Sequence, residues 1–151
     1  MSKKQVLLEC ASALLIILFL YASLSKFLDF STFRHDMKIQ PLPASLTPLL
    51  VWVIPCAEIV IAASLIFDHT RRLGLYSSLI LMGLFTIYSI AILLHLFRYV
   101  PCSCGGVIKH LTWPQHHVFN LFFTALAVGG ILIQDRNLFN NNSFKTKNSF
   151  S

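Results

Sequence analysis

The chain has four cysteines, and the most informative are Cys102 and Cys104, which a single serine separates. They lie in segment 101–106, which begins with proline and ends with two glycines. A disulfide between such close cysteines needs a bent backbone, because bridged Cα atoms lie about 4.4–6.8 Å apart, and proline and glycine favour bends. Strain makes a disulfide easier to reduce. The spacing therefore favours reversible thiol–disulfide exchange by a redox pair.

Two other interpretations of this pair stay open. The pair could form a structural ring that never turns over, or it could bind a metal ion together with His110, His116 or His117. A C-x-C pair near histidines matches zinc spacing only loosely, and the chain has just three methionines as soft ligands for copper. We therefore expect redox exchange and no metal site.

A second candidate is a carboxylate within an apolar segment. Glu58 lies in the middle of segment 46–67, where a charged side chain costs about 2.5–3.5 kcal/mol on insertion scales. Protonation, a cationic partner or a polar cavity must offset that cost. Pro55 adds a polar atom, because it leaves a backbone carbonyl one turn earlier without its helical donor. The candidate partners are Lys26 and His95, and either a structural clamp or a functional intramembrane site is consistent with this pattern.

The other cysteines carry less information. Cys56 follows Pro55, and we interpret it as a small apolar filler of the helix interface. The alternative is a relay thiol for the loop pair, or a neighbour of a bound quinone, which would then be the cofactor. Cys10 lies near the start of the first apolar segment and is expected to be inert.

These candidates belong to a chain that is too apolar for a soluble domain. Of 151 residues, 56% are apolar and 12% are charged, whereas soluble domains carry about 25% charged residues. The net charge is +6, but the basic residues are scattered singly or in pairs between apolar segments. They form no basic face, so nucleic-acid binding is not expected. The remaining class is a small polytopic membrane protein with the lipid bilayer as its surroundings.

Four segments are long enough to span a bilayer, which takes about 20 apolar residues. They cover about residues 6–27, 46–67, 73–97 and 113–133. The fold class is therefore all-α, a four-helix transmembrane bundle formed by residues 1–135.

Two further segments do not span. Phe30, Phe33 and Met37 recur at helical spacing and predict a short helix within 28–40, lying in the outer membrane interface. Residues 136–151 are rich in Asn, Ser and Lys, which predicts a disordered cytoplasmic tail.

The basic residues also predict the orientation. The N-terminus, the second connection and the tail together carry seven Lys and Arg, against five on the other side. Cytoplasmic loops are enriched in such residues, so both termini are predicted to be cytoplasmic. The connection 98–112 then faces the oxidising side, where disulfides persist.

The order of these features resembles the MauE family of methylamine-utilisation membrane proteins, within the wider DoxX-like group. The resemblance covers about residues 1–135 and rests on three motifs: Ser23-Leu24-Ser25-Lys26-Phe27, Pro55-x-x-Glu58 and Pro101-Cys102-Ser103-Cys104-Gly105-Gly106. It implies a four-helix protein of the bacterial inner membrane. It also implies that Cys102 and Cys104 are the redox pair and that Glu58 and Lys26 are polar positions of the helical core.

The resemblance further implies a role in the maturation of methylamine dehydrogenase, whose small subunit is rich in disulfides, beside a thioredoxin-like partner. The expected function is therefore thiol–disulfide exchange during the maturation of secreted or periplasmic proteins. Two rivals stay open. One is a non-enzymatic membrane scaffold or chaperone subunit, and the other is a small carrier that uses Glu58.

Overall fold

The computed structural model describes residues 2–96 and 112–148, and these residues form helices and short connections without a β-strand. The described residues form helices α1 (Lys3–Leu28), α2 (Phe30–Ile39), α3 (Thr47–Ile66), α4 (Arg71–Leu93) and α5 (Trp113–Asn148). Four helical segments are long and apolar enough to cross a membrane: α1, α3, α4 and the part Pro114–Arg136 of α5. The predicted fold class, a polytopic helical membrane protein, is confirmed.

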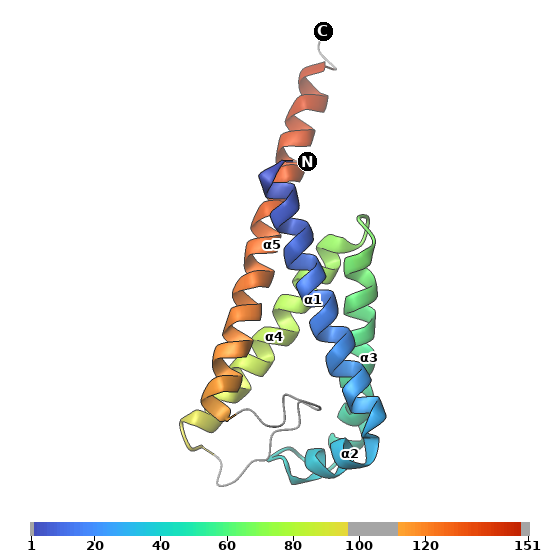
Figure 1. Cartoon of the computed structure of the whole chain (residues 1–151), viewed down its shortest axis with the longest axis vertical. Coiled ribbons are helices and arrows are strands. Elements are labelled where there is room, and N and C mark those ends of the chain that lie inside the picture. The colour runs from blue at the N-terminus through green and yellow to red at the C-terminus, as the bar shows by residue number, and fades with distance from the viewer. Residues whose placement is uncertain (1, 97–111, 149–151) are drawn as a thin grey trace.

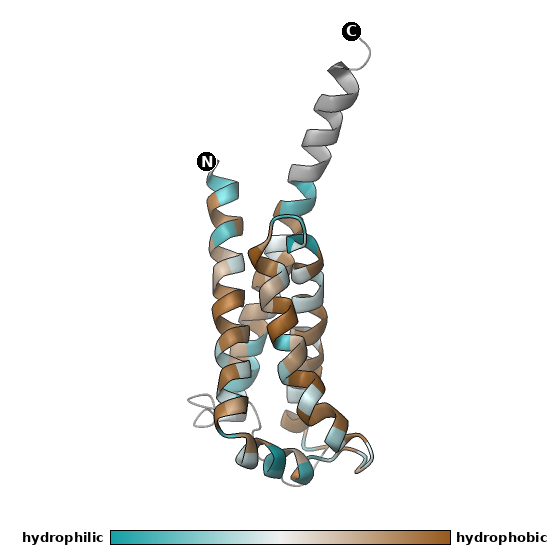
Figure 2. Cartoon of the chain, turned by 90° about the vertical axis from the view of Figure 1, so that its right-hand side faces the viewer, coloured by the Kyte–Doolittle hydropathy of each residue, from teal (hydrophilic) through white to brown (hydrophobic). Residues whose placement is uncertain are grey.

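The outer surface of the bundle carries many large apolar side chains. Ile17, Val60 and Ile87 are more than half exposed, each on a different helix. Figure 2 shows hydrophobic residues along the long helices and hydrophilic residues on α2 and near the helix ends. A contiguous apolar surface of this extent would favour aggregation in water. In a bilayer the same surface contacts lipid chains.

The four long helices form two pairs. Helix α1 packs against α3, and α4 packs against α5, with further contacts between α1 and α5 and between α3 and α4. Figure 1 shows that the pairs approach each other at the end with the chain termini and diverge toward the end with α2.

Small residues permit the close approach at the end with the termini. A Cβ atom at Gly74 of α4 would lie 2.9 Å from the Leu65 side chain of α3, and one at Gly130 of α5 would lie 2.9 Å from Leu75. Small residues let helix backbones approach closely in lipid. The contacts of α4 with α3 and with α5 are therefore tightly packed at this end.

Charged groups also connect the helices at the tightly packed end. Arg71 of α4 donates hydrogen bonds of 2.7 and 3.3 Å to the two carboxylate oxygens of Glu9 on α1. It also lies 2.5 Å from the Asp68 carboxylate in the α3–α4 connection. The next residue, Arg72, lies 3.1 Å from Asp135 of α5. These ion pairs join α1, α4 and α5 where the helices leave the apolar region.

The short helix predicted within 28–40 is confirmed as α2, which lies across the open end of the bundle (Figure 1). Its Phe33 and Met37 are buried and pack with Val51 of α3. Phe30 lies 4.9 Å, centroid to centroid, from the Trp52 ring. Aromatic and aliphatic contacts thus hold α2 against α3.

The third predicted span is too long by four residues, because α4 ends at Leu93 and not at 97. His95 adopts a left-handed conformation with φ of 55°. Its N–H donates to the carbonyl of Ile92, and the N–H of Leu96 donates to the carbonyl of Ala91. This is the Schellman pattern, which ends a helix and is usually built on glycine. Histidine is among the few other residues enriched in this conformation.

The prediction of disorder directly after the last span is also wrong for the backbone. Helix α5 continues to Asn148 and projects beyond the bundle (Figure 1). The sequence has no glycine or proline after Gly130, so no residue in this stretch breaks the helix. Polar composition predicted the tail, but polar residues are compatible with a helix outside the membrane.

Candidate functional site

A buried ion pair joins α1 to α3. The Nζ atom of Lys26 lies 2.8 Å from Oε1 and 3.1 Å from Oε2 of Glu58. It also donates a hydrogen bond of 3.3 Å to the backbone carbonyl of Ala22, one turn earlier in α1. Lys26 is 4% exposed and Glu58 is 1% exposed. Three hydrogen bonds therefore compensate the ammonium group for the loss of water.

The local sequence explains how α3 presents Glu58 to the interior. Val51, Pro55, Glu58 and Ala62 are all buried, and their spacing of three or four residues places them on one face of the helix. Pro55 has no N–H to donate to the Val51 carbonyl. The face that carries Glu58 is therefore also the face with an interrupted backbone hydrogen-bond ladder.

The ion pair lies in the wall of a cavity of about 440 Å³. All five helices contribute to its lining, which is mostly apolar. The volume is within the range of small-molecule pockets, about 300–1,000 Å³. The cavity occupies the space between the two diverging helix pairs, and α2 closes it at the open end of the bundle.

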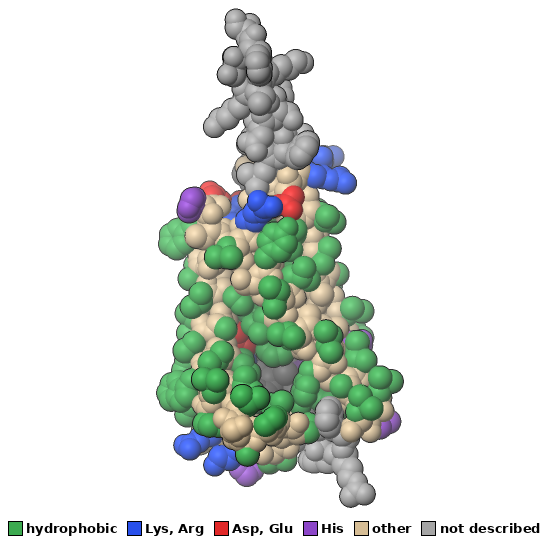
Figure 3. All heavy atoms as spheres, turned by 180° about the vertical axis from the view of Figure 1, so that it is seen from behind, with side chains coloured by type: hydrophobic (Ala, Val, Ile, Leu, Met, Phe, Trp, Pro, Cys, Tyr) green, Lys and Arg blue, Asp and Glu red, His purple; other side chains and the backbone are tan. Residues whose placement is uncertain are grey.

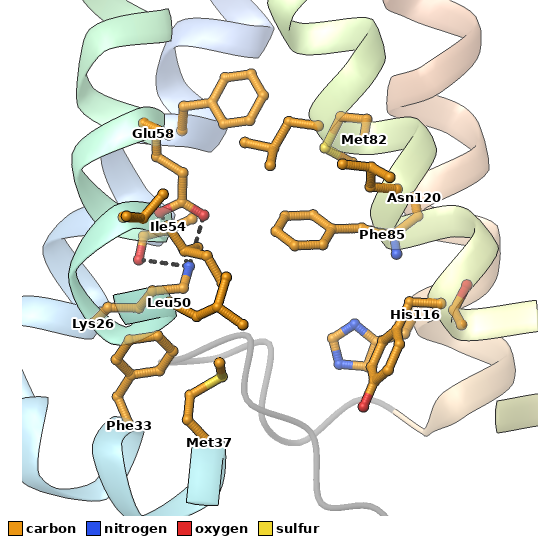
Figure 4. A pocket seen from close by; sticks show the side chains of 18 of the residues that line it. Lys26, Phe33, Met37, Leu50, Ile54, Glu58, Met82, Phe85, His116 and Asn120 are labelled. Atoms are coloured by element: carbon orange, nitrogen blue, oxygen red, sulfur yellow. Dashed lines mark hydrogen bonds and ion pairs between the residues drawn. The ribbon is translucent and has the colours of Figure 1, made fainter. Parts of the chain in front are cut away.

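The polar groups of the cavity are on opposite walls. Figure 4 shows Lys26 and Glu58 on one side and His116 and Asn120 on the other, with the Phe85 ring between the two sides. His116 is 2% exposed and Asn120 is also buried, and both line the cavity. They are four residues apart in α5 and therefore lie one turn apart on the same face. Apolar walls with a few convergent polar groups are typical of ligand sites.

A side-chain cap fixes the start of α5 near this wall. The backbone N–H of Thr112 donates a hydrogen bond of 2.9 Å to the side-chain oxygen of Gln115, which is one half of a T-x-x-Q capping box. The N–H of His116 donates to the Thr112 carbonyl at 2.9 Å. The position of His116 is thus set by the first turn of the helix.

Further hydrogen bonds hold α4 against α5 beside the cavity. Ser89 Oγ lies 2.9 Å from Nδ1 of His117, and the hydroxyl oxygens of Thr86 and Thr124 lie 3.1 Å apart. Tyr88 also donates a hydrogen bond to the side-chain oxygen of Gln40, which follows α2. The α5 wall is therefore fixed to α4, and α4 is fixed to the segment that closes the end of the bundle.

The cavity opens sideways to the outer surface of the bundle. Val53 of α3 and Leu84 of α4 both line the cavity, yet they are 47% and 58% exposed. They belong to the two helices that diverge on this side. Figure 3 shows the corresponding face, which is hollowed in its lower half. Since the apolar outer surface faces lipid, this opening leads into the hydrocarbon layer.

The structure distinguishes between the two candidate partners of Glu58. Lys26 reaches the carboxylate, whereas His95 is exposed beyond the end of α4 and does not line the cavity. Cys56 is exposed on α3, so its interpretation as an interior filler is wrong. It lies between Pro55 and Glu58, which occupy the inward face, and it is consequently turned outward. A relay role for Cys56 stays a prediction.

Several predicted residues lie outside the described part of the chain. Cys102, Cys104 and His110 belong to residues 97–111, for which no structure is described. The flanking residues are described: Leu96 follows α4 and Thr112 precedes α5, at the same end of the bundle as α2 (Figure 1). Within the described residues, no group of three or more His, Cys, Asp and Glu side chains could hold a metal ion.

The sequence alone did not indicate that α5 contributes a wall to a cavity. There, His116 was a candidate metal ligand only, and Asn120 was not a candidate residue. The available signal was the i, i+4 spacing of these two polar residues at the start of an apolar segment.

Comparison with known proteins identifies a family. The family described as "Methylamine utilisation protein MauE" matches residues 4–133, which is most of the chain. No curated protein and no solved structure matches.

Proposed function

Since this chain belongs to the MauE family, we propose that it is a membrane-embedded thiol–disulfide redox protein that acts on secreted or periplasmic proteins. The observation that carries this proposal is the position of the C-x-C pair in the chain. Cys102 and Cys104 lie in the sequence that connects α4 to α5, and both of these helices contribute described residues to the lining of the cavity. A bacterial inner membrane with both termini in the cytoplasm would place this connection on the oxidising side.

The proposed step is an exchange in two attacks. A thiolate of the substrate, or of a thioredoxin-like partner, attacks the Cys102–Cys104 disulfide and forms a mixed disulfide, which releases one cysteine of the pair as a thiolate. The second substrate thiolate then attacks the mixed disulfide. The substrate gains a disulfide and loses two electrons, and Cys102 and Cys104 gain those electrons as two thiols. The family description names methylamine utilisation, so proteins of that process are the first substrates to test.

A redox titration of the pair in membranes tests this function. In a Cys10→Ser/Cys56→Ser background, alkylation after equilibration with a dithiothreitol couple reports on Cys102 and Cys104 alone. We expect a reversible two-electron transition above about −300 mV, the range of labile disulfides. A pair that stays oxidised throughout, or thiols that never form a disulfide, would contradict the proposal. If the transition is found, Cys104→Ser should trap the partner as a mixed disulfide through Cys102.

The scaffold alternative makes a different prediction. If the bundle only holds a partner in place, Cys102→Ser/Cys104→Ser should leave maturation of that partner unchanged, as judged by its disulfide content in the periplasm. The redox function instead predicts that the thiols of the partner stay reduced when the double serine variant replaces the wild type.

A carrier function is favoured by one specific observation, the buried Glu58 carboxylate in a cavity that opens to the outer surface. In that case Glu58→Gln should abolish function, whereas the double serine variant should retain it. The opposite pattern would favour the cysteines as the functional groups.

A further inference from the structure

We propose that the cavity binds the ring of a membrane 1,4-quinone, with one ring oxygen near the Glu58 carboxylate and the other near His116 and Asn120. The residues on which this inference rests all belong to the described part of the chain. The reaction assigned to the bound quinone rests on the proposed function, whereas the binding itself does not.

The first argument is the placement of the polar groups. A 1,4-quinone carries two oxygen atoms at opposite ends of one flat ring, and the cavity carries polar groups on two opposite walls (Figure 4). Asn120 offers both donors and an acceptor in its carboxamide, so it can bind a carbonyl or a hydroxyl. His116 adds an imidazole on the same wall.

The wall with the ion pair suits the reduced form of the ligand. The contacts of Lys26 with Glu58 and Ala22 use all three ammonium hydrogens. Each Glu58 oxygen accepts one bond from Lys26 and has capacity for another. A quinol hydroxyl can supply that donor. The two walls together therefore bind both redox forms, as a site for a mobile electron carrier requires.

The second argument is the shape and polarity of the rest of the cavity. Leu50, Ile54, Met82 and Phe85 provide apolar walls for the faces of a ring. The opening beside Val53 and Leu84 leads toward lipid, so a long apolar tail can remain in the hydrocarbon layer. A lipid acyl chain alone offers no hydrogen-bonding group to the polar side chains on either wall, whereas the two ring oxygens of a quinone do.

A quinone also completes the electron balance of the proposed function. After each exchange, Cys102 and Cys104 are thiols and must be oxidised again. When they form a disulfide, two S–H bonds break, one S–S bond forms, and two electrons and two protons leave. A quinone that accepts both becomes a quinol, and its two carbonyls become hydroxyls. The oxidant is then a carrier that is already dissolved in the membrane.

Two alanines of α3 provide a matched pair of variants. Ala57 lines the cavity, whereas Ala63 is exposed and does not. Ala57→Trp should fill the cavity, and Ala63→Trp should place the same ring in lipid. The full-length protein is reconstituted in phospholipid nanodiscs and titrated with decylubiquinone. Bound quinone is measured after separation of the discs and compared with protein-free discs.

We expect saturable binding to the wild type, binding weakened by about tenfold or more in Ala57→Trp, and a change within about twofold in Ala63→Trp. Asn120→Leu, which removes the carboxamide and keeps the branched shape of the side chain, should also weaken binding. It serves as the second test if Ala57→Trp loses its helical circular dichroism.

Three results would overturn the inference: no saturable binding to the wild type, equal binding by the two tryptophan variants, or equal competition by a decyl alcohol that lacks the ring. The double variant Cys102→Ser/Cys104→Ser separates this inference from the proposed function. It should bind decylubiquinone like the wild type. If the wild type binds quinone but its dithiol form produces no quinol, the redox function fails while the binding site stands.

Discussion

The Lys26–Glu58 pair gives the sharpest prediction on stability. We consider Lys26→Met, which keeps the length and the apolar stem of the side chain and removes only the ammonium group. Glu58, which is 1% exposed, then loses the two hydrogen bonds from Nζ. The described residues offer no second cation within ion-pair distance of this carboxylate.

The magnitude follows from two opposing contributions. At 2.8 Å and an effective dielectric constant of about 20, the two charges attract each other by about 6 kcal/mol. Removal of each ion from water costs several kcal/mol, so the complete pair contributes little net stability. A single remaining ion keeps its own cost without the attraction. Lys26→Met should therefore lower the free energy of unfolding by about 3–5 kcal/mol, and Lys26→Met/Glu58→Met should restore most of that loss.

The free energy of unfolding can be measured by titration of SDS into protein in dodecylmaltoside micelles, followed by circular dichroism. The wild type, both single variants and the double variant form a complete cycle. A loss below about 1 kcal/mol for Lys26→Met would show that the carboxylate does not need its partner, and the energetic role of the pair would be refuted. A double variant as unstable as the sum of the single variants would show that the two side chains are not coupled.

Two further predictions concern the tightly packed end. Gly74→Ala should destabilise the bundle by about 1–3 kcal/mol, because its Cβ would meet both the side chain and the backbone nitrogen of Leu65. Gly83→Ala on the same helix, with no atom within 4 Å of its Cβ, should be neutral in the same SDS titration. Glu9→Gln should weaken the contact with Arg71 and lower stability by about 1 kcal/mol or less, because Glu9 is 43% exposed. Two results would contradict these assignments. One is an equal loss of unfolding free energy in Gly74→Ala and Gly83→Ala, and the other is a larger loss in Glu9→Gln than in Lys26→Met.

The helices could be predicted from the sequence because the length and hydropathy of a span are local properties. The segments 6–27 and 46–67 correspond closely to α1 and α3. The end of α4 could not be predicted in this way, since His95 ends the helix through its backbone conformation and not through its polarity. The same applies to the tail, where composition predicted disorder and the backbone continues as a helix.

The site was only partly accessible from the sequence. Glu58 and Lys26 could be singled out because charges are rare and costly in lipid. The choice between Lys26 and His95 depended on the contact between α1 and α3, which is a tertiary property. The orientation of Cys56 was misjudged for a related reason. Helix α3 is apolar on the lipid side as well as on the inner side, so hydrophobic periodicity does not reveal which face is inward.

The cavity itself has no local signature. It exists because Gly74 lets α4 approach α3 closely at one end, while the two helix pairs diverge at the other. His116 and Asn120 become facing partners of the ion pair only through that divergence.

The connection between Lys26 and Glu58 also bears on the order of membrane insertion. The two residues are 32 positions apart and belong to the first two spans of the chain. N-terminal parts of a protein are made and fold first, so Glu58 can meet its cation as soon as α3 enters the bilayer. Lys26, near the end of α1, can keep its ammonium group at the interface until then. The costly carboxylate can therefore meet its cation before α4 and α5 are inserted, and these two helices then complete the cavity against a pair of helices whose buried charges are already matched.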